Sequence, residues 1–151
     1  MARPRAQFTL WVACHNRLPT KDRLLKFGTV TDGKYAFCDL METADHILFS
    51  CPKSADIWNF VLSWMKVNHQ PGRWKNGLTW LEKHTRGKSM RSKLLKCVVA
   101  ETIYDIWSFR NLCIFLGHNA NSNIGLDVIR TICHRASLHS GLNLYCEQLK
   151  L

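Results

Sequence analysis

Residues 91–116 constrain the fold most, because their apolar side chains recur every three or four positions over 26 consecutive residues. That period predicts one long helix. Its inner stripe contains Leu94, Leu95, Val98, Thr102, Ile103, Ile106, Arg110 and Cys113. We therefore expect a mainly α protein in which this helix is the longest.

Shorter stretches of the same period predict helices over 7–16, 21–27, 53–67, 78–84 and 122–138. Thr20 and Ser122 suit helix N-caps, and Gly28 and Gly117 suit helix ends. Asp32-Gly33 between β-prone pieces predicts a turn or minimal hairpin over 29–37. We expect about five or six helices, with a short β-hairpin or zinc-knuckle-like segment near 29–51.

In the short helix expected over 7–16, Phe8, Trp11, Val12 and His15 share the helical period, which predicts an apolar stripe on one face. Trp58, Trp64 and Trp107 lie on apolar stripes as well, so core packing is expected for them and for Trp11. Trp74 and Trp80 flank a basic stretch instead, which makes them the better candidates for stacking on nucleic-acid bases.

At 151 residues the chain has the size of one domain. With 46% hydrophobic and 21% charged residues it is neither disordered nor fibrous. No apolar run approaches the ~20 residues of a membrane span, and the amino terminus makes a poor signal peptide. Seven cysteines cannot all pair with one another. We expect a nuclear or cytoplasmic protein that is not secreted and has no membrane partner.

The net charge of +10 is unevenly distributed, because residues 51–100 hold ten basic and two acidic side chains. Such an excess is either a solvated face or a surface that attracts polyanions such as RNA or DNA. Contacts to phosphates would be largely independent of base sequence. The candidate contacts are Arg73, Lys75, Arg86, Lys88, Arg91, Lys93 and Lys96, with Arg17, Lys21 and Arg23 as a secondary patch.

Cys38, His46 and Cys51 place three soft metal ligands within 14 residues. Structural zinc takes four nitrogen or sulfur ligands. Met41 occupies the position that would complete a Cys-x-x-Cys knuckle, and an uncharged thioether is a poor zinc ligand. The spacing alone leaves two readings open: a metal site, or two buried thiols beside a hydrogen-bonded histidine.

Four phrases of the chain match a known family. They are PRAQFTLW (4–11), HNRLPTKDRL (15–24), ET (42–43) followed by HILFSCP (46–52) with Trp58, and IWSFRNLCIF (106–115). With these phrases the chain resembles the zinc-binding domain at the C-terminal end of plant LINE-type (non-LTR) retrotransposon reverse transcriptases. The resemblance runs from about residue 3 to about residue 117.

The resemblance implies a zinc-binding, nucleic-acid-associated module with Cys38, His46 and Cys51 as ligands. Met41 stands where the family has its second cysteine. Water, Asp39, Glu42 or Asp45 would therefore have to supply the fourth ligand, or the chain has lost metal binding. The implied domain spans 1–118, and 119–151 would be a helical extension packed on it.

The chain contains no Asp-Asp pair of the kind that holds the metal ions of the polymerase core, so we expect no enzyme activity. Its length suggests a freestanding fragment of such an element. The alternative function is a repurposed protein-interaction or regulatory module with a degenerate metal site and no nucleic-acid role. A small cysteine-dependent enzyme is the least favoured reading.

Overall fold

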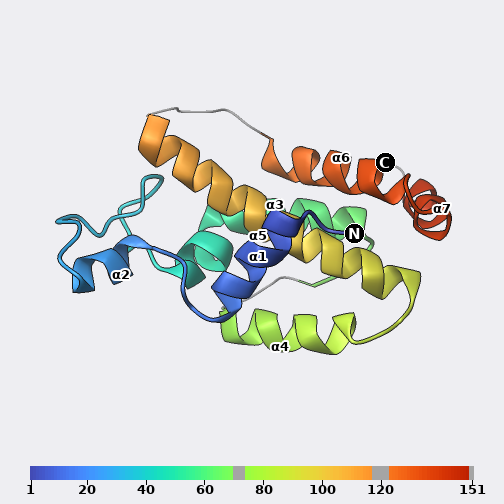
Figure 1. The fold of residues 1–151 in the computed structure, drawn as a ribbon, viewed down its shortest axis with the longest axis horizontal. Helices are drawn as coiled ribbons and strands as arrows, with labels where there is room; N and C mark the ends of the chain where they lie inside the picture. The colour runs from blue at the N-terminus through green and yellow to red at the C-terminus, as the bar shows by residue number, and fades with distance from the viewer. Residues whose placement is uncertain (70–73, 117–122, 150–151) are drawn as a thin grey trace.

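The computed structural model describes residues 1–69, 74–116 and 123–149, with the side chains of 74–76 left out. These residues form eight helical segments and no strand (Figure 1). In chain order they are α1 (Pro4–Cys14), α2 (Lys21–Lys26), the π-helix η1 (His46–Ser50), α3 (Pro52–Trp64), α4 (Trp74–Thr85), α5 (Met90–Leu116), α6 (Ile124–Ala136) and α7 (Ser140–Gln148). The mainly α prediction is confirmed, with more helices than expected.

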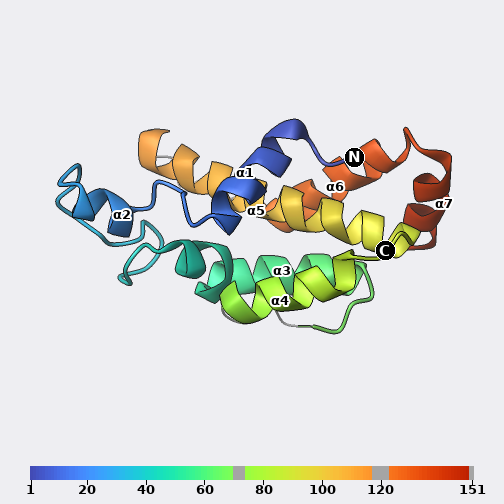
Figure 2. The ribbon, with the colours of Figure 1, turned by 60° about the horizontal axis from the view of Figure 1, so that its bottom comes forward.

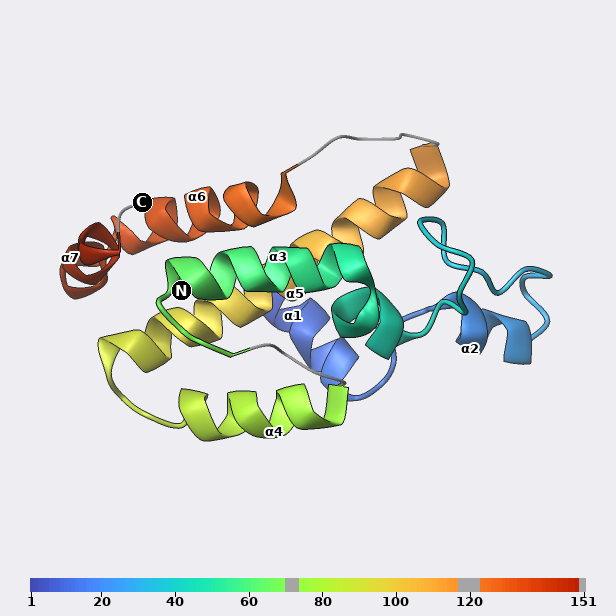
Figure 3. The same ribbon diagram turned by 180° about the vertical axis from the view of Figure 1, so that it is seen from behind.

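Helix α5 is the longest helix of the described residues, as its period predicted, and it lies at the centre of the molecule (Figures 1 and 2). Helix α1 crosses one side of it, and α3 lies on the opposite side (Figures 1 and 3). Helices α6 and α4 also pack against α5. The middle of α5 is buried on several faces, since Cys97, Val98, Ala100 and Thr102 are all nearly inaccessible to solvent.

The core is rich in aromatic side chains, as expected for Trp58, Trp64 and Trp107, which are all buried. The rings of Phe49 and Trp58 stack with centroids 5.5 Å apart. The indole nitrogen of Trp58 donates a hydrogen bond of 2.7 Å to the carbonyl of Leu48. This contact joins η1 to α3 and fixes the chain between them.

The expected core role of Trp11 is wrong, because 49% of this residue is exposed. The buried residues of α1 are instead Ala6, Thr9 and Ala13. Small side chains allow two helix backbones to approach closely, and Ala6 packs with Cys97 and Ala100 of α5. The larger side chains Phe8, Trp11 and His15, which share the other face, are therefore turned outward.

The hairpin predicted over 29–37 and the β-hairpin or zinc-knuckle-like segment expected near 29–51 are wrong as well, because the described residues there form no strand. The described residues contain one isolated antiparallel bridge, between Lys34 and Met41. The carboxylate of Asp32 accepts a hydrogen bond from the backbone N–H of Lys34, which closes a local turn and uses that N–H. The N–H of Thr29 donates to the carbonyl of Leu24, so the first expected strand continues the end of α2.

Helix caps follow the sequence in part. Thr20 is the N-cap of α2, and Gly28, with φ of 65°, follows its C-cap. Ser122 and Gly117 lie outside the described residues. Asn123 caps α6, and its side chain accepts a hydrogen bond from the N–H of Leu126.

Helix α6 packs against α3 and α5 through an apolar stripe. The stripe consists of Val128, Ile129, Ile132 and Ala136. The boundary expected between residues 118 and 119 lies outside the described residues, so the division into 1–118 and 119–151 stays a prediction. None of the described helices has the length and apolar character that crossing a bilayer requires.

Candidate metal centre and basic surface

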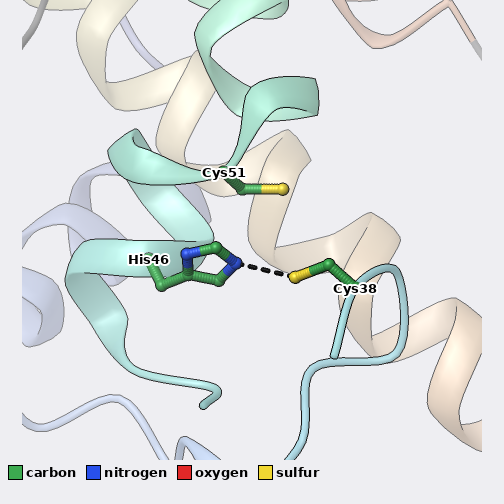
Figure 4. Close-up of side chains that lie close together, drawn as sticks. All are labelled: Cys38, His46 and Cys51. Atoms are coloured by element: carbon green, nitrogen blue, oxygen red, sulfur yellow. Dashed lines mark hydrogen bonds between the residues drawn. The ribbon is translucent and has the colours of Figure 1, made fainter. Parts of the chain in front are cut away.

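Cys38, His46 and Cys51 come together at one point, with their Sγ and ring nitrogen atoms all within 4.8 Å of one another. Figure 4 shows the three side chains converging from the 28–45 loop, from η1 and from the residue before α3. Nε2 of His46 lies 2.9 Å from Sγ of Cys38. The three predicted ligands therefore form one cluster.

The π-helix η1 explains how His46 and Cys51 reach the same side. In an α-helix, residues five apart point about 140° away from each other. Here the N–H of Cys51 donates to the carbonyl of His46 over 2.8 Å, which is the five-residue hydrogen bond of a π-turn. Pro52 follows and keeps Cys51 in an extended conformation.

Cys51 is buried and is the N-cap residue of α3. Burial raises the pKa of its thiol, while hydrogen bonds from the backbone N–H groups of Lys53 and Ser54 act to lower it. Those N–H groups stabilise a thiolate. A metal ion that displaced the thiol proton would thus find Cys51 already provided with hydrogen-bond donors.

The loop that carries Cys38 is held by the backbone around the Lys34–Met41 bridge. The N–H of Glu42 donates to the carbonyl of Gly33 over 2.8 Å, and the N–H of Tyr35 donates to Leu40 over 2.9 Å. The buried ring of Tyr35 also contacts His46 edge to face, with centroids 5.6 Å apart. The loop is thus fixed next to η1.

A buried ion pair between Glu42 and Arg110 connects this segment to α5. The side chain of Glu42 is completely buried, and that of Arg110 is 5% exposed. Both oxygens of the carboxylate accept hydrogen bonds from the guanidinium, and Oε1 also accepts one of 2.9 Å from the N–H of Lys21. The guanidinium lies over the Trp107 ring at 4.8 Å.

Sequence reasoning missed this pair, although both residues lie in the phrases that carried the resemblance. Glu42 was considered only as a zinc ligand. A fully buried glutamate is almost always paired with a cation. Arg110 is the one charged residue on the inner stripe of 91–116, and this was the signal that could have identified it as the partner of Glu42.

The donor set fits a zinc ion at three of four positions. Bonds of about 2.0–2.3 Å place tetrahedral donors about 3.3–3.8 Å apart. Zinc would therefore require Cys38 Sγ and His46 Nε2, now 2.9 Å apart, to separate, and the widest pair, within 4.8 Å, to approach. Met41 is 51% exposed, and its sulfur packs over Gly33 beside Leu25. Zinc bound by these three residues would take its fourth ligand from elsewhere, as a zinc site with three protein ligands does from water.

The acidic residues considered as a fourth ligand are engaged elsewhere. Glu42 pairs with Arg110, and the almost fully exposed Asp39 carboxylate lies 3.7 Å from the Lys34 ammonium. The carboxylate of Asp45 accepts a hydrogen bond of 2.6 Å from the hydroxyl of Ser50. Among the described residues, none of the three joins the Cys-His cluster.

The predicted basic contacts fall into two separate groups. Lys88, Arg91, Lys93 and Lys96 are exposed at the amino end of α5, and Arg86 precedes them in a surface ion pair with Glu82. We call these five residues the basic strip. Arg73 lies outside the described residues, as does the side chain of Lys75.

The secondary patch lies around α2, at the end of the molecule opposite the basic strip (Figure 1). Two of its three cations hold the local structure. The ammonium of Lys21 contacts Asp32 and the carbonyl of Lys34, at 3.1 and 2.7 Å. The guanidinium of Arg23 donates to the carbonyl of Asn16. Arg17 is exposed.

Trp80 is a weaker stacking candidate than the sequence indicated. Trp80 is half-buried against the core, whereas Trp11 is exposed, and the Trp80 ring lies between the nearly parallel rings of His69 at 4.0 Å and His84 at 4.4 Å. The side chain of Trp74 lies outside the described residues.

The fold and the cluster define a helical protein with a three-donor site of the zinc type. Residues 1–58 match a family described as zinc-binding in reverse transcriptase. The match confirms the resemblance for this part of the chain, which contains Cys38, His46 and Cys51, and it makes zinc the implied metal. The chain has no match among curated proteins or among solved structures.

Proposed function

We propose that the chain is a non-catalytic, zinc-binding module of reverse-transcriptase origin that binds RNA or DNA without sequence preference. The observation that supports nucleic-acid binding is the basic strip. All five of its cations are exposed, and in the described part of the chain four of them form no ion pair. Exposed cations without acidic partners, close together in the sequence, provide an electrostatic footprint for phosphates.

Salt dependence of binding tests the nucleic-acid role. Each phosphate contact contributes about −0.7 to the slope of log K against log salt for single strands. Charge reversal at Arg86, Lys88 and Arg91 should reduce the magnitude of that slope by about 2 and abolish retardation at ~50 mM salt. Reversal at Lys26, Lys66 and Arg130, which are also exposed, provides a control with the same change in net charge.

Two results would contradict this part of the proposal. The native chain could fail to retard single-stranded RNA and DNA at low salt. Alternatively, the control variant could lose as much affinity as the strip variant, which would assign the effect to net charge. Retained biological activity in a strip variant that no longer binds nucleic acid would favour the protein-interaction function instead.

Metal analysis tests the zinc part. We expect zinc in protein prepared without added metal, and loss of that zinc in Cys51→Ser. Cys14→Ser is the matched control, because Cys14 is an exposed thiol outside the cluster. Zinc-loaded protein should leave RNA and DNA substrates uncut and unextended, as the non-catalytic proposal requires. Zinc that persists in Cys51→Ser would disprove the assigned ligands.

A further inference from the structure

We propose that the outward face of α1 binds unpaired bases of single-stranded nucleic acid. This face, called here the aromatic face, consists of Arg5, Phe8, Trp11 and His15. The inference rests on the proposed function and adds to it the class of nucleic acid and the place where bases, rather than phosphates, are bound.

The packing of α1 separates two kinds of side chain. Ala6, Thr9 and Ala13 are buried, on the side that packs on α5. Positions 5, 8, 11 and 15 follow the helical period, so they share the opposite face. In Figure 1, α1 crosses α5 on the near side, and no other labelled helix lies over it.

The rings of the aromatic face form a continuous exposed row. Phe8 is 65% exposed and Trp11 is 49% exposed. The Phe8 and Trp11 centroids lie 6.1 Å apart at 25°, and those of Trp11 and His15 lie 4.5 Å apart at 40°. Exposed aromatic rings beside one another provide a platform for successive bases, because every base has an apolar π-face.

Two hollows border this row. One of about 510 Å³ lies beside Phe8 and is lined by Arg5, Tyr104 and Trp107. The other, of about 780 Å³, lies beside Trp11 between α1, α5 and α7, and Lys93 and Lys96 form part of its wall. The row is thus flanked by space large enough to admit planar groups.

Charge identifies the occupant. Arg5, Lys93 and Lys96 are exposed, and within the described residues none of them forms an ion pair. Arg3, by contrast, is neutralised by Glu101 and Asp105. Aromatic rings bordered by unpaired cations match a ligand with flat bases and an anionic backbone. A duplex fits less well, because its bases are already stacked on one another.

The geometry also connects the aromatic face to the basic strip. Lys93 and Lys96 belong to the strip, and they share a hollow with Trp11. A single strand that follows the cations at the amino end of α5 would therefore pass beside α1 with its bases toward the rings.

The test separates bases from phosphates. A thymidine oligonucleotide of about 12 residues is compared with an abasic oligonucleotide of the same length and charge. The native chain should bind the first about 5- to 150-fold more tightly. Trp11→Ala and Phe8→Ala should reduce that preference and leave affinity for the abasic strand unchanged. Phe27→Ala is the control, because Phe27 is 75% exposed and lies next to α2.

A second measurement needs no variant. Photo-crosslinking of the native chain to an oligonucleotide containing 5-iodouracil should label the peptide that carries Phe8 and Trp11. Equal, salt-sensitive affinity for both oligonucleotides, or crosslinks confined to other segments, would overturn the aromatic face while leaving the proposed function intact. No salt-sensitive binding of either oligonucleotide would overturn both.

Discussion

Replacing Arg110 by Met should strongly destabilise the protein, because it leaves the Glu42 carboxylate without its partner. Glu42 is fully buried and the Arg110 side chain is 5% exposed. Removing one member of a buried pair costs about 3–5 kcal/mol, since the remaining charge is desolvated and uncompensated. The N–H of Lys21 still donates to this carboxylate, but one neutral donor replaces little of a guanidinium.

Urea unfolding followed by circular dichroism, with and without zinc, measures this loss. The control is Arg130→Met, because Arg130 and Asp127 form an ion pair in which both side chains are more than half exposed. Such a pair contributes about 0–1 kcal/mol. The double variant Glu42→Gln, Arg110→Met should be less destabilised than the sum of its single changes by about 0.5–3 kcal/mol.

Two results would refute the argument about the Glu42–Arg110 pair. A loss below about 1 kcal/mol in Arg110→Met would mean that water reaches Glu42. Strict additivity in the double variant would mean that the two side chains do not interact in the folded protein.

Three further changes test other parts of the structure. Met41→Cys should tighten zinc binding at least about tenfold in a competition titration, because a fourth protein ligand completes the tetrahedral set. An unchanged affinity would mean that position 41 faces away from the cluster. Ile132→Ala should lower the free energy of unfolding by about 2–5 kcal/mol, since Ile132 is fully buried, and should leave one unfolding transition. Two transitions would mean that α6 unfolds independently of the other helices. Ellman's reagent at pH 8 should modify Cys14 first, because Cys14 is exposed whereas Cys97 and Cys146 are buried. Burial raises the pKa of all three thiols, to about 11 for Cys97 and Cys146, which leaves those two about one thiolate in a thousand; a fast phase that persists in Cys14→Ser would contradict this.

The sequence predicted what depends on local pattern. The period of 91–116 identified α5, because a helix covered on several sides repeats its apolar residues over many turns. Cys38, His46 and Cys51 were identifiable because metal ligands are few in kind and lie close together in this sequence. The three residues form one cluster, and all three lie in the part of the chain that matches the family.

What the sequence did not predict depends on contacts between distant segments. Glu42 and Arg110 are 68 positions apart, and no local period joins them. The face of α1 was assigned wrongly because Phe8 and Trp11 are more apolar than Ala6 and Thr9. Close packing against α5 favoured the small residues, a choice that only the partner helix determines.

The position of Arg110 in the chain determines when the segment that carries the metal ligands can be joined to α5. Cys51 is made 59 residues before Arg110. At a synthesis rate of about 5–20 residues per second, this interval lasts roughly 3–12 seconds. During that interval all three ligands exist, but the arginine that fixes their segment to α5 has not been made. A zinc ion captured by the nascent chain would therefore join Cys38, His46 and Cys51 before Glu42 could pair with Arg110, and the ion pair would form around a loop already closed.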